Sequence, residues 1–181
     1  MPALLLELFS EEIPARMQAR AADDLLRLVA DGLDKAGLAH DDGRAYATPR
    51  RLAIAIDGIP AAQPDVVDER KGPRVGSPQP AIDGFLRGAG VASLEACERR
   101  ATDKGEFWFA TVRRAGRPTV DVLGGVIETA VRALPWPKSM RFGQSTFRWV
   151  RPLPHAHGLF DGKALPGALA LDPETVQPYA A

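Results

Sequence analysis

Pro135-Trp136-Pro137-Lys138-Ser139-Met140-Arg141-Phe142-Gly143 is followed closely by Phe147-Arg148-Trp149-Val150-Arg151-Pro152. The two prolines beside Trp136 exclude a helix and favour an extended, stiff backbone. The aromatic and β-branched residues from Phe147 to Val150 are typical of a short strand. No acidic residue stands between Glu128 and Asp161. The stretch therefore predicts a rigid ribbon that presents cations and indole rings from one small region.

Two interpretations of this ribbon are open. Arginine suits bidentate binding of phosphate or carboxylate, and aromatic rings can stack on bases. The ordinary alternative is a set of core aromatics beneath a solvated cationic face. We expect Trp136 and Trp149 to be mainly core, because large aromatics beside prolines more often anchor a chain than bind bases.

The composition is that of a globular protein whose binding must be local. The chain has 181 residues, 45% of them hydrophobic and 25% charged, which suits one domain with at most a small appendage. Its 23 basic residues balance 23 acidic ones, so no global field attracts nucleic acid. A single cysteine, Cys97, rules out an internal disulfide, and no apolar run approaches the ~20 residues of a membrane span. These features predict a soluble, cytoplasmic protein.

Hydrophobic periodicity around the ribbon predicts an α+β fold. We expect a mostly antiparallel sheet with two longer amphipathic helices and one short helix packed on it. The expected strands are 3–9, 44–47, 52–57 and the polar edge strand 65–71, followed by a hairpin of 94–102 with 106–114 and a last strand and turn over 158–163. The expected helices are 14–36, 81–87 and 119–134, and Gly72-Pro73 with 76–80 reads as a connector.

Three smaller features complete the pattern. Arg50 and Arg51 follow a turn, and on an extended backbone neighbouring side chains point to opposite faces, so at most one of them serves a given surface. Gly37 is well placed to cap the first long helix. Cys97 is expected to act as a small buried hydrophobe.

Signals for chemistry are weak. Glu11 and Glu12 suggest acid–base work, but carboxylates near a helix start also oppose the positive end of its dipole. His155 and His157 are spaced as a metal pair, with no third or fourth ligand evident nearby. The sequence contains no phosphate-binding glycine loop, nucleophile elbow or zinc spacing. It therefore predicts no catalytic residue and no metal site.

Seven motifs taken in order resemble one family, over roughly Leu4 to Leu153. Together they are similar to the amino-terminal part of the bacterial glycyl-tRNA synthetase beta subunit. The motifs are Leu4-Leu5-Leu6-Glu7-Leu8, Ser10-Glu11-Glu12-Ile13-Pro14, Ala47-Thr48-Pro49-Arg50-Arg51-Leu52-Ala53, Gly72-Pro73, Thr102-Asp103-Lys104-Gly105-Glu106, the run 135–143 and Arg148-Trp149-Val150-Arg151-Pro152.

The resemblance implies a two-subunit glycine–tRNA ligase, two alpha and two beta chains in the full-length family. In that family the alpha subunit activates glycine with ATP and magnesium, while the beta subunit is needed for charging and makes most of the tRNA contacts. This chain would then bind no cofactor, and its partners would be the alpha subunit and tRNA for glycine. The candidate contact residues are Arg50, Arg51, Lys138, Arg141, Arg148 and Arg151.

The resemblance also implies an arrangement of domains. Residues 1–153 are expected to form the amino-terminal domain, and 154–181 a poorly patterned segment that reads as a truncated continuation. Beta chains of the family are several times longer, and this sequence departs from the pattern at Pro154-His155-Ala156-His157. Two rival functions stay open: a stand-alone RNA-binding or scaffold module without a ligase role, and a small hydrolase using Glu11 and Glu12.

Overall fold

The computed structural model describes residues 2–173 and 176–180, and the chain divides into two compact units. We call residues 1–63 with 117–181 the body, and residues 64–116 the insert. Each unit packs helix against sheet, which confirms the predicted α+β class.

The body holds a seven-stranded sheet in the order β2-β3-β1-β7-β10-β9, with β8 paired to β7. All its pairs are antiparallel except β7 with β10. Its elements are β1 (Leu4–Phe9), α1 (Ala15–Lys35), β2 (Arg44–Thr48), β3 (Arg51–Ile56), α3 (Thr119–Ala133), β7 (His155–Phe160), β8 (Lys163–Ala164), β9 (Ala168–Ala170) and β10 (Val176–Ala180).

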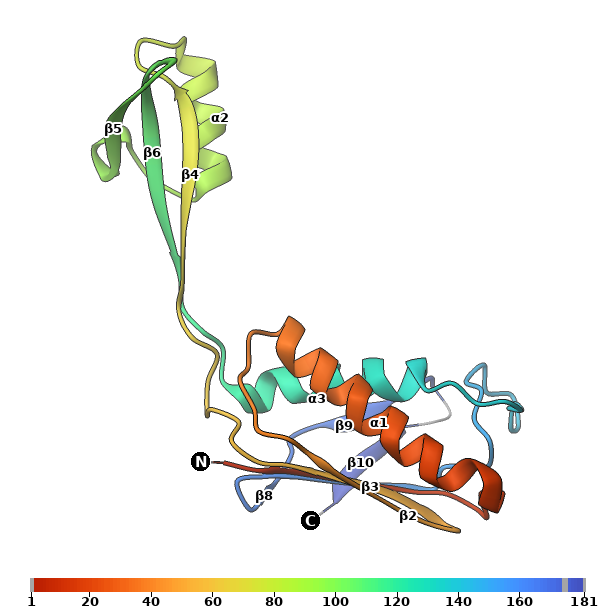
Figure 1. The fold of residues 1–181 in the computed structure, drawn as a ribbon. Coiled ribbons are helices and arrows are strands. Elements are labelled where there is room, and N and C mark those ends of the chain that lie inside the picture. Colours follow the sequence, from red (N-terminus) through yellow and green to blue (C-terminus); the bar gives the residue numbers. More distant parts are fainter. Residues whose placement is uncertain (1, 174–175, 181) are drawn as a thin grey trace. The chain divides into compact units, whose positions relative to one another are not determined.

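The core of the body lies between this sheet and its two helices. Because strand side chains alternate between faces, Leu4, Leu6 and Leu8 of β1 point the same way, and all three are fully buried. The helices α1 and α3 lie on one side of the sheet (Figure 1). The predicted first strand and both long helices are thereby confirmed to within one or two residues.

The end of α1 shows how local sequence sets a boundary. Gly37 follows the last turn with φ of 69°, a conformation that glycine adopts without a Cβ penalty. The Leu38 amide then donates to the Leu33 carbonyl at 2.9 Å, and the Gly37 amide donates to Asp34 at 2.9 Å. These two bonds form a Schellman motif, so the predicted cap is confirmed.

Residues beyond Pro154 take part in the body sheet, although their sequence periodicity is weak. β7 begins at His155, whereas the sequence predicted a strand from Gly158. It pairs along the whole of β1, from Leu4 opposite Phe160 to Phe9 opposite His155. The strand was predicted to begin too late because His155 and His157 are polar. Both lie on the face of β7 that is turned away from the helices, where polar side chains are compatible with a strand. Further along, the buried side chains are Leu165, Leu169, Leu171 and Tyr179.

The short strand predicted from Phe147 to Val150 is wrong. Residues 135–154 form no regular strand; a single antiparallel bridge joins Met140 to Trp149. Aromatic and β-branched content favours a strand only where a neighbouring strand can extend the ladder. In this stretch the backbone is held by burial of the Trp149 side chain and not by a ladder of hydrogen bonds to a neighbouring strand.

The insert is a three-stranded antiparallel sheet, in the order β4-β6-β5, with one helix. Its elements are β4 (Val66–Arg74), α2 (Gln79–Ala89), the 3-10 turn η1 (Leu94–Ala96), β5 (Cys97–Thr102) and β6 (Gly105–Arg114). The expected polar edge strand, short helix and hairpin are confirmed, except that residues 94–96, expected at the start of the hairpin's first strand, form η1.

Two predictions within the insert need correction. Gly72-Pro73 lies inside β4 rather than in a connector, at a register shift between Lys71 and Arg74. An edge strand tolerates a proline at such an irregularity, because the missing N–H costs no ladder bond there. Cys97 is half-buried rather than buried, since it opens the edge strand β5. Partial burial raises the pKa of its thiol.

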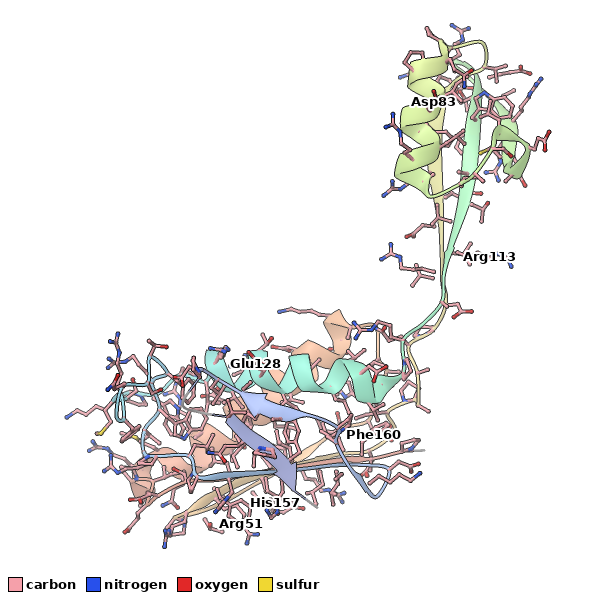
Figure 2. All side chains as sticks on the ribbon, turned by 180° about the vertical axis from the view of Figure 1, so that it is seen from behind. Arg51, Asp83, Arg113, Glu128, His157 and Phe160 are labelled. Carbon is pink, nitrogen blue, oxygen red and sulfur yellow. The ribbon has the colours of Figure 1, made fainter. Side chains whose placement is uncertain are left out.

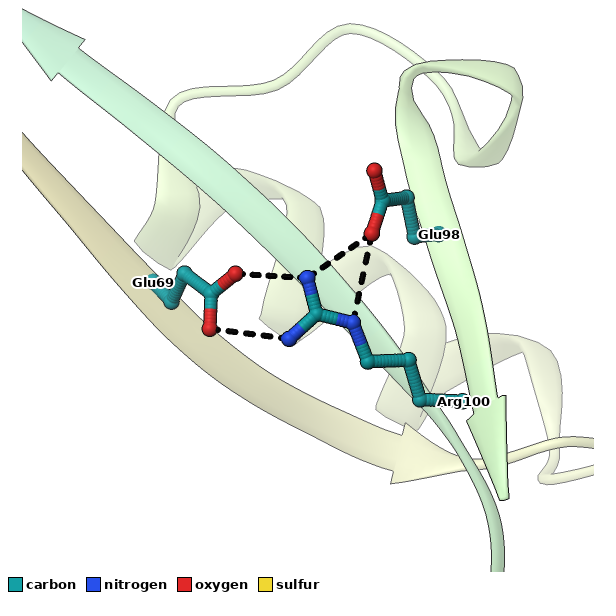
Figure 3. A network of polar contacts seen from close by, with 3 residues as sticks. All are labelled: Glu69, Glu98 and Arg100. Carbon is teal, nitrogen blue, oxygen red and sulfur yellow. Dashed lines mark hydrogen bonds and ion pairs between the residues drawn. The ribbon is translucent and has the colours of Figure 1, made fainter.

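The open face of the insert sheet carries an ion network. Arg100 donates to both carboxylate oxygens of Glu69, at 2.6 and 3.0 Å, and to Glu98 at 2.8 Å (Figure 3). The hydrogen bond from Arg100 holds the pKa of Glu69 below its usual value. These carboxylates occupy the Arg100 guanidinium, so it is a poor candidate for binding an external anion.

Candidate functional site

The basic segment, residues 135–152, is anchored by its aromatic side chains. Trp149 is only 1% exposed, and its backbone exchanges hydrogen bonds of 2.9 and 3.1 Å with Met140. Trp136 meets the Trp149 ring edge-on at 4.9 Å, and Phe147 stacks on it at 5.6 Å. Trp149 is therefore core, as expected, whereas Trp136 is half-buried.

A carboxylate from elsewhere in the chain braces this segment. Oδ2 of Asp172 accepts a hydrogen bond from the Phe147 amide at 2.9 Å and another from the Ser145 hydroxyl. Asp172 lies just after β9, which delivers it to the segment. The interval that is free of acidic residues in sequence is thus not free of them in space. Asp172 and Phe147 are 25 residues apart in sequence, so no local pattern could have predicted this contact.

The four cations predicted within the segment differ in how far the fold already occupies them. Lys138 and Arg141 are exposed, and neither forms an ion pair with any carboxylate in the described residues. Arg148 folds back and donates to the Ser139 carbonyl at 2.7 Å. Arg151 is half-buried and donates to the Val150 carbonyl at 2.9 Å. Lys138 and Arg141 are therefore the most available for a ligand.

The β2–β3 turn supplies the other two candidates. Arg50 is exposed in the turn itself, while Arg51 opens β3 and contacts Glu7 at 3.0 Å. The Arg51 guanidinium also lies over the Phe9 ring, at 5.4 Å from its centre. Because Arg50 lies in the turn and not in extended backbone, the expectation that Arg50 and Arg51 point to opposite faces does not hold for this pair.

Arg51 belongs to a polar cluster on the face of the body sheet that turns away from the helices. Glu7 on β1 lies between Arg51 and His157, with His157 Nδ1 at 3.7 Å from its carboxylate. The His157 ring also meets Phe9 at 4.8 Å, and Figure 2 shows Arg51 and His157 on the same face. Three adjacent strands, β3, β1 and β7, thus supply this cluster.

Backbone hydrogen bonds bring the turn and the basic segment to the same end of the body sheet. The Ser10 amide donates to the Arg50 carbonyl at 2.9 Å, and the Glu11 amide donates to the Pro152 carbonyl at 3.0 Å. The loop between β1 and α1 therefore ties together two regions that are about a hundred residues apart in sequence.

Two arginines that no sequence motif singled out adjoin the segment. Arg16 and Arg20 of α1 line a cavity of about 150 Å³ together with Trp136 and its flanking prolines. Arg20 is 3.7 Å from Asp24, whereas Arg16 forms no ion pair among the described residues. Their i, i+4 spacing places them on one helix face, but only the fold reveals that this face meets Trp136.

The weaker chemical candidates gain no support. Glu11 and Glu12 are exposed in the loop before α1, outside its first turn. Across residues 2–173 and 176–180, no three His, Cys, Asp or Glu side chains gather as a metal site. None of the helices in that part of the chain combines the length and apolar character that a bilayer span requires.

Comparison with known proteins gives a consistent result. Residues 4–174 match the family described as glycyl-tRNA synthetase beta subunit. The chain is 53% identical to the glycine–tRNA ligase beta subunit of Rhodospirillum centenum, over 94% of its own length and 24% of the relative's. Identity to the beta subunit of Paracoccus denitrificans is 55%, over 84% of this chain and 22% of that one. Identity to the beta subunit of Phenylobacterium zucineum is 48%, over 92% of this chain and 24% of that one.

The three matches cover 84–94% of this chain but less than a quarter of the length of each relative. The family match includes the basic segment and the β2–β3 turn, and so both groups of candidate cations. The chain belongs to the glycyl-tRNA synthetase beta subunit family.

Proposed function

We propose that this chain acts as the amino-terminal part of a glycine–tRNA ligase beta subunit. In this role it supports the ATP-dependent attachment of glycine to tRNA through contacts with tRNA and the alpha subunit, without reaction chemistry of its own. The working complex has two alpha and two beta chains in the cytoplasm. In this proposal ATP and magnesium act at the alpha subunit.

The observation that carries this proposal is the pair of exposed cations on an anchored segment. Lys138 and Arg141 have no carboxylate partner among the described residues, while Trp149 and Asp172 hold the backbone that bears them. A cation held in this way reaches a phosphate without first losing an internal ion pair. Binding costs less when the contacting group is already positioned.

The test is removal of the two charges by Lys138→Gln and Arg141→Gln. If each meets one phosphate, log K against log salt should become shallower by about 0.7–0.9 for each lost contact. Affinity for a glycine tRNA transcript should therefore fall most at low salt. Arg113→Gln is the matched control, because Arg113 is exposed on β6 of the insert and makes no ion pair in the described residues.

Capture of the alpha subunit is measured on the same variants. Weaker capture without tRNA would make the segment a subunit contact, which also supports the ligase role. If both assays and charging by the alpha–beta complex were unchanged in correctly folded variants, the segment would be a solvated face and the proposal would fail.

A further inference from the structure

A second cavity is lined by the later part of the basic segment. Its volume is about 190 Å³, and it opens between the segment, the residues that follow it and β10. Phe142, Phe147 and Trp149 contribute rings to the lining, Arg151 a guanidinium and Gln177 an amide. Aromatic walls with a few polar groups are the usual composition of a binding site.

The size of the cavity limits what it can hold. Sites for whole small molecules usually measure about 300–1,000 Å³. At about 190 Å³ this cavity is too small for a complete nucleotide but has room for one planar ring. The remainder of such a ligand would stay outside, along the exposed part of the segment.

The aromatic wall is already positioned in the absence of a ligand. The Phe147 and Trp149 rings are nearly parallel, with an interplanar angle of 28°, and Trp149 is buried beneath. Asp172 fixes the Phe147 amide at 2.9 Å. The half-buried Phe147 ring is therefore a rigid platform, which lowers the entropy cost of stacking a ligand on it.

We propose that this cavity receives a single unstacked base of a bound RNA. Phe147 supplies the stacking surface, the Gln177 amide donates to and accepts from the base edge, and Arg151 binds the adjoining phosphate or the base edge. This inference rests on the proposed function, because it makes tRNA the molecule that supplies the base. RNA recognition commonly targets splayed bases in this way, with aromatic stacking and edge hydrogen bonds.

Two cations beside the cavity favour RNA over an apolar side chain of a protein partner, while the Asp172 carboxylate behind the lining accepts hydrogen bonds from the Phe147 amide and the Ser145 hydroxyl. The polyanionic backbone that carries an inserted base must pass close by, and Arg148 and Arg151 belong to the same short run as the cavity wall. Neither pairs with a carboxylate among the described residues. An apolar protein anchor would need no such cations beside it.

The experiment uses this chain with a glycine tRNA transcript and two uncharged substitutions. Phe147→Leu keeps an apolar side chain but removes the aromatic face, and we expect about tenfold weaker binding from the lost stacking. Gln177→Ala removes one hydrogen-bonding amide and should weaken binding about two- to tenfold. Neither change removes a charge, so the salt dependence of binding should stay as in the wild type.

Matched substitutions in the insert control for general damage. Phe109→Leu alters another half-buried ring, and Gln79→Ala removes another amide; both should leave affinity unchanged. Thermal unfolding confirms that the variants fold. Base-specific chemical probing of the tRNA should show one nucleotide protected by the wild type and exposed again with Phe147→Leu and Gln177→Ala.

Each outcome separates this inference from the proposed function. If Arg141→Gln weakens tRNA binding but neither cavity variant does, the cavity holds no base and only this inference fails. If the cavity variants weaken capture of the alpha subunit without tRNA, the occupant is a protein side chain and the inference is overturned. If no variant, including Arg141→Gln, alters tRNA binding, alpha-subunit capture or charging, the proposed function fails as well.

Discussion

Replacing Tyr179 by phenylalanine should abolish a specific loss of stability at alkaline pH. Tyr179 lies on β10, is 7% exposed, and its hydroxyl has no hydrogen-bond partner among the described residues. Burial, with a smaller contribution from the charge of Glu128, raises its pKa from 10.0 to about 12. The folded protein therefore holds this phenol neutral in a range where the unfolded chain ionises it.

The sign and size follow from proton linkage. Because the folded pKa is the higher one, the stabilisation is complete below pH 10 and is lost as pH rises through about 12. A pKa difference of about two units corresponds to a limiting loss of about 2.7 kcal/mol, and to about 1.4 kcal/mol at pH 11. For a chain of this size, 1.4 kcal/mol lowers Tm by about 3–6 °C.

The assay is thermal unfolding of the wild type and Tyr179→Phe from pH 7 to 11.5. At pH 7 the two should differ by less than about 1 kcal/mol, since the lost hydroxyl had no partner. At pH 11 the variant should be the more stable by about 1.4 kcal/mol. Tyr46→Phe is the control, because Tyr46 is 55% exposed and should give a curve parallel to the wild type.

Parallel curves for the wild type and Tyr179→Phe over this whole pH range would contradict this prediction. They would mean that the phenol meets water in the folded state, and that β10 is not packed on β7 as described. The measurement therefore also tests whether the chain beyond Leu153 belongs to the same cooperative unit as β1.

Three further predictions concern single sites. Asp172→Ala removes the carboxylate that accepts from both the Phe147 amide and the Ser145 hydroxyl, and should lower the free energy of unfolding by about 1–3 kcal/mol in urea titrations while weakening tRNA binding in parallel. Gly158→Ala places a Cβ within 2.9 Å of two core side chains and should cost about 1–3 kcal/mol, whereas Gly125→Ala, with nothing within 4 Å in a helix, should stabilise by about 0.5–1 kcal/mol; thermal unfolding compares the two. Arg100→Gln should raise the pKa of Glu69 toward its ordinary value in an NMR titration. The native pair stabilises the fold above that ordinary pKa and loses this contribution as the pH falls through the lowered pKa, so the variant should lack it.

The elements that the sequence predicted correctly are those with strong local signals. The first long helix has a regular apolar stripe and is capped by Gly37, and the hairpin of the insert turns at Gly105, whose φ is 115°. Both signals lie within a few residues of the structure that they specify. Alternation along β6 separates Trp108 and Ala110 from Phe107 and Phe109, but only the structure shows that the face with Trp108 and Ala110 is the buried one.

What could not be predicted depends on contacts between distant residues. β7 is central because β1 pairs along all of it, which the polar residues at its start conceal. The basic segment is organised by Asp172 and by burial of Trp149 rather than by a strand ladder. Periodicity reports which residues share a face of their own element. It carries no information on which distant side chain that face will meet.

The structure ranks the candidate cations by how much each is already bound within the protein. Arg51 has a carboxylate partner, and Arg148 and Arg151 donate to backbone carbonyls, so an external phosphate must compete with these internal contacts. Lys138 and Arg141 face no such competition among the described residues. Removing either of these two should therefore leave stability within about 0.5 kcal/mol of the wild type, as for other surface substitutions. A loss of tRNA or alpha-subunit binding in those variants would then report recognition itself, whereas a loss in Arg51 or Arg148 variants would combine recognition with local rearrangement.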